Sequence, residues 1–274
     1  MPSAGRTASD TAQKAADSKP LELVARAGLI AYGVVHLLIG WIALRLAWGE
    51  SREEADQSGA LQALARQPFG TALLWSVAVC LVALAAWQVS QAIWGFGGGD
   101  LPGQARRKFT AGATALAYLV LAASAASFAM GSGSSAEQVQ QSTAQGMLGL
   151  PFGQMLVGAV GLGIIGVGVA HMSKSFSSRF RDEIGSTSMS ADMRRVITLM
   201  GRMGYAAKGV AFAVVGLLLV YAAATFDPGE AKGLDGALRT IAEQPFGQIG
   251  LTAVAVGFVA FGIFACVQSR FRPM

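Results

Sequence analysis

The fold is decided by stretches such as residues 27–48, AGLIAYGVVHLLIGWIALRLAW, in which Arg45 is the one charged side chain. A helix of about 20 apolar residues crosses a hydrocarbon core of about 30 Å. Stretches of the same kind occupy residues 71–94, 109–130, 153–173, 203–225 and 248–268. Only 14% of the chain is charged, whereas a soluble domain has about 25%. The sequence therefore predicts an all-α transmembrane protein with six spanning helices.

The chain repeats itself, and the clearest marker is a tripeptide that precedes every second apolar stretch. This tripeptide is Pro68-Phe69-Gly70, then Pro151-Phe152-Gly153, then Pro245-Phe246-Gly247. A shift of 176 residues also places Arg26 on Arg202, Gly28 on Gly204, Gly33 on Gly209 and Gly40 on Gly216. In the middle copy Ala115 and Ala122 stand where the last two of these glycines would be. Self-similarity at a fixed spacing indicates duplication of one structural unit, here a two-helix hairpin.

The predicted repeats are residues 22–97, 105–182 and 198–273, with a disordered cytoplasmic tail at 1–21 and a cytoplasmic linker at 183–197. Each unit crosses the membrane twice, so all three have the same orientation. Parallel repeats are most simply related by an axis along the membrane normal. A pseudo-threefold bundle is the prediction, and a row of three hairpins is the alternative.

Orientation follows from the basic residues. Fifteen Lys and Arg residues lie in the amino tail, the two linkers between repeats and the carboxyl end, against five in the alternate loops. Positively charged segments stay on the cytoplasmic side. We therefore expect both termini in the cytoplasm.

Each alternate loop is expected to hold a short amphipathic helix at the membrane interface. Ser58 and Asp235 are the predicted N-caps, because their oxygens can accept a bond from free backbone N–H groups. The apolar face would be formed by Leu61 and Leu64 in the first loop, matched by Leu238 and Ile241 in the third. The proline of each tripeptide suits the first position of the next spanning helix, where no N–H is needed.

This pattern resembles a bacterial membrane family called domain of unknown function 1206. The resemblance rests on Arg-x-Gly-x4-Gly in the first helix, at Arg26 and Arg202, and on Gln-Pro-Phe-Gly before the second helix, at Gln67 and Gln244. It covers the chain from about residue 22 and is weaker in the middle copy. It implies a multi-pass protein of the bacterial cytoplasmic membrane with three repeats. It implies no activity and no site residues.

The glycines and a few polar residues in the spans are the candidate functional positions. Gly33 and Gly40 share one helix face, as do Gly209 and Gly216, which favours close helix packing. His36 lies on the same seam, where it is either a structural histidine or a ligand or proton site. Repeat alignment places it in two stacked rings of unlike residues, which are Tyr32, Thr114 and Lys208, and then His36, Tyr118 and Phe212. Such rings suit a binding pocket or a gated path, unless Lys208 extends to the nearby membrane surface instead.

Signals for catalysis, metal binding and nucleic-acid binding are missing from the sequence. No span has an Asp or Glu at its centre, and His36 and His171 lie at different depths, which argues against a haem held by both. We therefore expect no enzyme, no cofactor and no metal. The favoured hypothesis is an accessory or structural protein that binds membrane lipid, another membrane protein or a second copy. The alternatives are a small channel or carrier along the pseudo-axis and, less favoured, a membrane enzyme or redox carrier.

Overall fold

The computed structural model describes residues 19–50, 53–93, 101–177 and 190–271, which contain helices and no strands. Six helices are long and apolar enough to cross a membrane. They are α2 (Lys19–Ala47), α4 (Gly70–Ile93), α5 (Leu101–Ala129), α7 (Gly153–Phe176), α8 (Ala191–Thr225) and α10 (Gly247–Phe271). The predicted all-α transmembrane fold of three two-helix repeats is confirmed.

In each repeat, one short helix follows the first long helix. The three short helices are α3 (Gln57–Ala65), α6 (Ala136–Leu148) and α9 (Leu234–Ala242), and a 3-10 turn, η2 (Pro228–Glu230), precedes α9. Leu61 and Leu238 are fully buried, so α3 and α9 turn their apolar faces toward the protein core. We call the side of the membrane that holds these helices the cap side, and the side that holds the connections between repeats the linker side.

The helix ends differ from the predictions at several places. Ser190 accepts a bond from the Met193 N–H at 3.3 Å, so α8 begins within the predicted linker. The predicted tail at 1–21 overlaps α2, which begins at Lys19; residues 1–18 of the tail and residues 183–189 of the linker lie outside the described residues. The predicted N-caps are wrong: Asp56 caps α3 by accepting from the Gly59 N–H, and Gly233 precedes α9.

The tripeptides form one turn, built in the same way three times. Phe69, Phe152 and Phe246 have φ of 63°, 63° and 62°, a left-handed backbone that is unusual for a residue other than glycine. Their side chains are exposed. The glycine that follows each of them has no room for a Cβ, because the backbone of the preceding short helix passes directly beside it. The prolines lie inside this turn, two residues before the spanning helix, and not at its first position as predicted.

Helices of different repeats form the closest pairs. α2 packs against α10, α4 against α5, and α7 against α8. The predicted packing glycines lie at two of these contacts. A Cβ at Gly33 would be 2.8 Å from the Gly262 carbonyl oxygen of α10, and one at Gly216 would be 2.6 Å from that of Gly161 in α7. Gly40 and Gly209 lie in the same two contacts, so small residues bring these backbones together.

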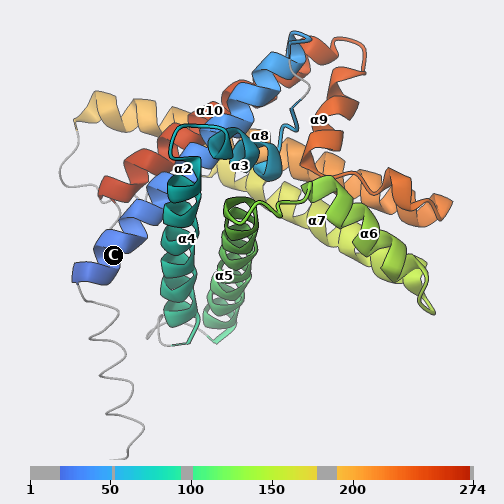
Figure 1. The fold of residues 1–274 in the computed structure, drawn as a ribbon, viewed down its shortest axis with the longest axis horizontal. Coiled ribbons are helices and arrows are strands. Elements are labelled where there is room, and N and C mark those ends of the chain that lie inside the picture. The colour runs from blue at the N-terminus through green and yellow to red at the C-terminus, as the bar shows by residue number, and fades with distance from the viewer. Residues whose placement is uncertain (1–18, 51–52, 94–100, 178–189, 272–274) are drawn as a thin grey trace, which may run out of the picture.

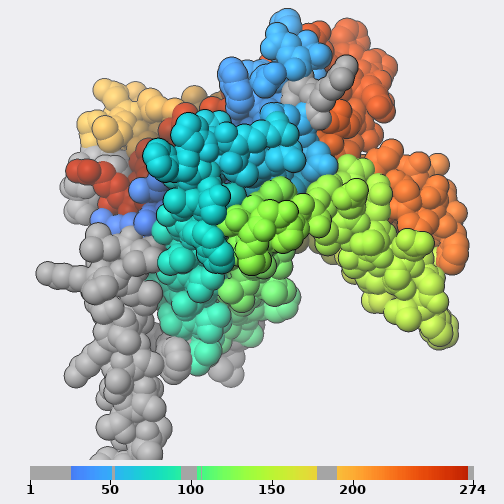
Figure 2. Space-filling view, viewed as in Figure 1, coloured from blue at the N-terminus to red at the C-terminus, as the bar shows by residue number. Residues whose placement is uncertain are grey.

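The two helices within a repeat pack in the outer repeats only. α2 contacts α4 and α8 contacts α10, whereas α5 and α7 are not closely packed. Figure 1 shows α4 and α5 side by side, with α6 and α7 leading away from them. In Figure 2 the two pairs diverge and leave open space between α5 and α7. We call this space the lateral opening. A threefold bundle would close it, so the pseudo-threefold arrangement stays a prediction.

Candidate functional site

The centre of the molecule holds a polar cluster formed by Lys208 of α8 and two residues of α2, Tyr32 and His36. Lys208 Nζ donates to Tyr32 Oη at 2.8 Å and to His36 Nε2 at 3.3 Å. His36 Nδ1 lies 2.9 Å from the Tyr32 carbonyl oxygen. A carbonyl only accepts, so Nδ1 carries the proton and Nε2 presents a lone pair to the lysine.

Lys208 is buried, with 7% of its surface exposed, and is held without a carboxylate in the part of the chain that the structure describes. An ammonium has three N–H donors. Two go to Tyr32 and His36, and the third side of the ammonium faces the Phe261 ring, whose centroid is 4.2 Å from Nζ. A cation over an aromatic face is stabilised by the ring quadrupole. Among the described residues, the lysine is thus satisfied by neutral partners.

Aromatic rings from two further helices, α5 and α10, and from α8 itself surround the cluster. Tyr118 of α5 meets the Tyr32 ring edge-on with centroids 5.4 Å apart. Phe261 of α10 lies 4.8 Å from the His36 ring, and Tyr205 of α8 lies 5.4 Å from Phe261. Because these rings come from all three repeats, the cluster is a junction of the whole bundle.

A second lysine lies near the end of α7. Lys174 Nζ donates to Tyr205 Oη at 2.9 Å, and its side chain is half-buried. Tyr205 therefore links this lysine to the aromatic rings around Lys208. The site as a whole holds two lysines in the half of the bundle nearer the linker side.

The chain matches the family described as Domain of Unknown Function (DUF1206) three times, at residues 27–95, 109–178 and 203–272. The chain belongs to this family. It is also 32% identical over 260 residues to "Uncharacterized protein YxxB" of Bacillus subtilis (strain 168), an alignment that covers 94% of each chain. No solved structure matches it. With six membrane-length helices, this DUF1206 chain is an integral membrane protein.

The structure of this DUF1206 chain brings four of the six predicted ring residues together, namely Tyr32, His36, Tyr118 and Lys208. The other two are elsewhere. The Thr114 hydroxyl donates to the Thr110 carbonyl of its own helix at 2.8 Å, and the Phe212 ring faces His171 at 5.5 Å. Lys208 turns inward and does not extend to the membrane surface as in the alternative interpretation.

Sequence reasoning missed Phe261, Tyr205 and the role of Lys174. It placed only the first helix of each repeat at the centre, whereas Phe261 belongs to the second helix of repeat three. Tyr205 precedes Lys208 by three residues, and residues so spaced share a helix face. That spacing was a usable signal for Tyr205.

The repeat alignment explains why the middle repeat is open. In repeat one, a Cβ added at Gly28 would lie 2.5 Å from Leu84 of α4. Gly204 is the matching glycine of repeat three, and a Cβ added there would lie 2.6 Å from Phe261 of α10. The equivalent pair in the middle repeat is Thr110 and Val167, and both are exposed. A threonine replaces the glycine that lets the helices cross. By this equivalence, Thr110 and Val167 are the positions at which α5 and α7 would cross in a closed repeat.

A separate acidic junction ties the three short helices together on the cap side. The Ala55 N–H donates to Asp235 Oδ1 at 2.7 Å, which joins the first loop to α9, and the Ala136 N–H of α6 donates to Ser58 Oγ at 3.1 Å. Burial raises the pKa of Asp56, whose Oδ1 accepts from Ser58 and the Gly59 N–H. Its Oδ2 is buried with no hydrogen-bond partner in the described part of the chain.

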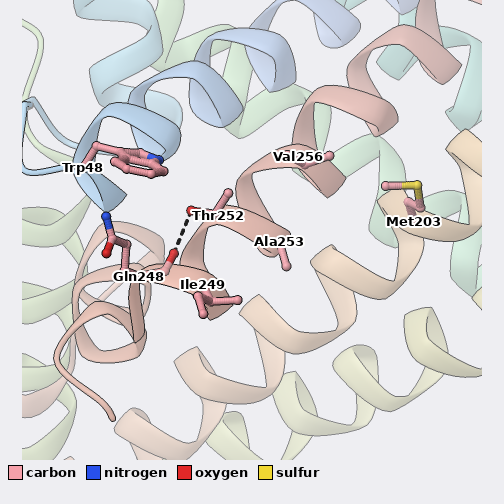
Figure 3. Close-up of a pocket in the computed structure, with 7 residues that line it drawn as sticks. All are labelled: Trp48, Met203, Gln248, Ile249, Thr252, Ala253 and Val256. Atoms are coloured by element: carbon pink, nitrogen blue, oxygen red, sulfur yellow. Dashed lines mark hydrogen bonds between the residues drawn. The ribbon is translucent and has the colours of Figure 1, made fainter. Parts of the chain in front are cut away.

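Nothing in the described ranges groups three His, Cys, Asp or Glu side chains as metal ligands. A groove of about 420 Å³ runs along the outside of α10 (Figure 3). It is lined by Trp48, Met203, Gln248, Ile249, Thr252, Ala253 and Val256. Its one marked polar contact is internal, from Thr252 Oγ1 to the Gln248 carbonyl at 2.7 Å. The groove is separate from the lysine cluster.

Proposed function

We propose that this protein is a non-enzymatic component of the bacterial cytoplasmic membrane that binds a lipid molecule in the lateral opening between α5 and α7. The observation that carries the proposal is the missing packing between these two helices, in contrast to the packed pairs α2 with α4 and α8 with α10. In a bilayer, space between two apolar helices does not stay empty. A lipid is the ready occupant, and a membrane partner or a second copy is the competing one.

The walls of the opening suit acyl chains. Val167 of α7 is 46% exposed and Thr110 of α5 is exposed as well. Gly163, one turn before Val167, has nothing within 4 Å of the place where a Cβ would stand. Thr110 and Thr114 lie one turn apart on α5, and the Thr114 hydroxyl is satisfied by its own helix. The opening therefore offers an apolar surface on which the Thr114 hydroxyl already has a hydrogen-bond acceptor.

Burial of the central cluster is the reason for proposing lipid binding and not a path for solutes. His36, Lys208 and Tyr118 are 3%, 7% and 8% exposed. Four of the six residues predicted to line a channel, which are Tyr32, His36, Tyr118 and Lys208, instead contact one another at the centre. Toward the cap side the chain continues with buried apolar residues such as Ile39 and Ile42.

Both termini are placed in the cytoplasm in this proposal. The support is the excess of Lys and Arg in the tail, the linkers and the carboxyl end, since basic segments remain on the cytoplasmic side. The bacterial relative of nearly equal length supports a bacterial cytoplasmic membrane.

Filling the opening tests the proposal. The protein is purified in a mild detergent that strips the surrounding lipid, and retained lipid is counted by native mass spectrometry. Val167→Trp should lower the retained lipid several-fold, because an indole would occupy the space between α5 and α7. Val169→Trp is the matched control, since Val169 is also exposed but lies on another face of α7. Absence of retained lipid in the unmodified protein, or equal loss in both variants, would contradict the proposal.

A further inference from the structure

Ser58 of α3 lies at the centre of the acidic junction on the cap side. Its Oγ is 2.7 Å from Glu54 Oε2 and 2.6 Å from Asp56 Oδ1, and it accepts from the Ala136 N–H of α6 at 3.1 Å. Ser58 is 4% exposed and Asp56 is fully buried. The hydroxyl therefore has three close polar neighbours, two of which are carboxyl groups.

The contacts of Ser58 require one proton more than two ionised carboxylates provide. A hydroxyl has one proton to donate and two lone pairs that accept. If Glu54 and Asp56 were both ionised, Ser58 could donate to only one of them, and the other carboxylate oxygen would face the hydroxyl oxygen with no proton between them. With one carboxyl protonated, that group donates to Ser58, and Ser58 donates to the other. The Ala136 N–H takes the second lone pair, so every contact is then satisfied.

Carboxylates from the other two repeats face this pair. Asp235 of α9 and Glu137 of α6 both interact with it electrostatically, and their negative charge favours retention of the proton. Among the described residues, the cations that face them are Arg239, which pairs with Asp235 at 2.7 Å, and Lys232, which acts on Glu137. The junction thus gathers acidic groups from all three repeats.

Burial holds the proton more tightly than an exposed carboxyl would. It raises the pKa of Asp56, and the charges of Glu54 and Asp235 raise it further, against the lowering effect of the bonds from Ser58 and the Gly59 N–H. Asp56 Oδ2 is buried without a hydrogen-bond partner in the described part of the chain, a costly place for a charged oxygen. Because the two carboxyls share one proton, its titration belongs to the pair.

The helix held by this junction is α6, the short helix of the middle repeat. Ala136 is its first residue, and Ser58 accepts one of the N–H groups that a helix leaves free at its start. A second bond, from Gln140 Nε2 to the Lys232 carbonyl at 3.1 Å, joins α6 to the third loop. Few side chains of α6 are buried. Its position therefore depends strongly on the bond at its N-terminus.

We propose that the acidic junction is a pH-sensitive latch, which holds α6 against α3 while Glu54 and Asp56 share a proton and loosens α6 when that proton is lost. The latch is fully closed below the ordinary aspartate pKa of about 3.9, and it opens as the pH rises through the pKa of the pair. In the orientation proposed above, the cap side faces the outside of the cell, so the latch responds to external pH. This inference does not require a lipid in the lateral opening.

Hydrogen exchange of α6 measures the latch, because exchange reports local opening of a helix. The full-length protein is labelled in detergent from about pH 4, near the ordinary aspartate pKa, upward past neutral pH. Labelling times are adjusted so that intrinsic exchange is equal at each pH, and mass spectrometry follows the peptide that covers α6. Protection of α6 should fall several-fold as the pH rises, the size of one lost hydrogen bond.

Glu54→Gln is the decisive variant, because the glutamine amide supplies the N–H that the shared proton provides. The amide donates to Ser58, which then donates to Asp56 at every pH, and Asp56 still caps α3 through the Gly59 N–H. Protection of α6 should stay high across the range. Ser58→Ala should leave it low at every pH. Glu243→Gln is the matched control, since it makes the same change at an exposed glutamate at the end of α9, outside the junction; it should behave like the unmodified protein.

Three results would overturn the latch. The first is α6 protection that does not change with pH in the unmodified protein, and the second is a pH dependence that Glu54→Gln leaves in place. The third is loss of the pH dependence in Glu243→Gln as well, which would assign it to general surface charge. Asp56→Asn is the second test if Glu54→Gln disturbs folding, and it too should remove the pH dependence. None of these results alters the lipid count in Val167→Trp, so the two proposals fail separately.

Discussion

The outer repeats and the middle repeat have the same order of helices but differ in whether their two long helices pack together. Repeats one and three close, with Gly28 beside Leu84 and Gly204 beside Phe261, whereas Thr110 and Val167 of the middle repeat stay apart and exposed. The outer repeats also share the bond from Lys208 to Tyr32 and His36, and Thr114 at the equivalent position bonds only within its own helix. The three copies thus share their spans, while the middle copy lacks the contacts that close the outer two.

The largest effect should come from placing a methyl group at the closed crossing. Gly204→Ala puts a Cβ 2.6 Å from the Cβ of Phe261. Overpacking of this kind costs about 1–3 kcal/mol, and backbone movement in a seam raises the cost toward the upper value. Thermal unfolding in detergent measures the loss.

A glycine in α7 of the open repeat should behave in the opposite way. Gly163→Ala meets nothing within 4 Å, and alanine in a helix is more favourable than glycine by about 0.5–1 kcal/mol. Equal destabilisation by the two substitutions would mean that the middle repeat is closed after all.

A smaller effect is expected from breaking the bond between the outer repeats. His36→Phe leaves the Lys208 ammonium without one of its acceptors, which should cost about 1–2 kcal/mol. Adding Lys208→Met should recover most of that loss, because a buried ammonium is then no longer present. The double-mutant cycle is measured by unfolding, with Thr114→Val as a control expected to change little. Additive effects of His36→Phe and Lys208→Met would show that the two residues are not coupled.

The smallest effect concerns the acidic junction, which joins all three repeats on the cap side. Because burial raises the pKa of Asp56 in the folded protein, this carboxyl stabilises the fold most when protonated. Its contribution is fully present below the ordinary aspartate pKa of about 3.9 and is lost as the pH rises through the folded pKa. Glu54 and Asp235 act in the same direction through their negative charge. Asp56→Asn should flatten this part of the stability profile, and an unchanged slope would contradict the assignment.

The sequence predicted the spans well because hydrophobic length is a property of each helix alone. The three Pro-Phe-Gly turns and the grouping of Tyr32, His36 and Lys208 were also within reach, since the repeats align these residues. The lateral order of the helices was not. Gly33 and Gly216 indicate that another helix packs closely against them, but they do not indicate which helix it is. The pairing of α2 with α10 and of α7 with α8 is therefore seen only in the structure.

The site was predictable only in part for the same reason. Phe261 and Lys174 belong to second helices, and no sequence pattern indicates that these helices reach the residues around Lys208. The N-caps failed because Ser58 and Asp235 are used for contacts between loops: Ser58 accepts from Ala136 and Asp235 accepts from Ala55. Local capping rules do not foresee such tertiary contacts. The replacement of a crossing glycine by Thr110 was visible in the alignment and gains meaning only once Gly28 and Gly204 are seen at the crossings.

The separation of α5 and α7 in a bilayer is the most direct test of the lateral opening. Spin labels are attached through Thr110→Cys and Val167→Cys in a chain whose Cys80 and Cys266 are replaced by alanine, and the distance is measured by double electron–electron resonance in nanodiscs. We expect α5 and α7 to be clearly farther apart than the about 8–10 Å between the axes of packed helices. A narrow distribution that corresponds to packed helices would contradict it.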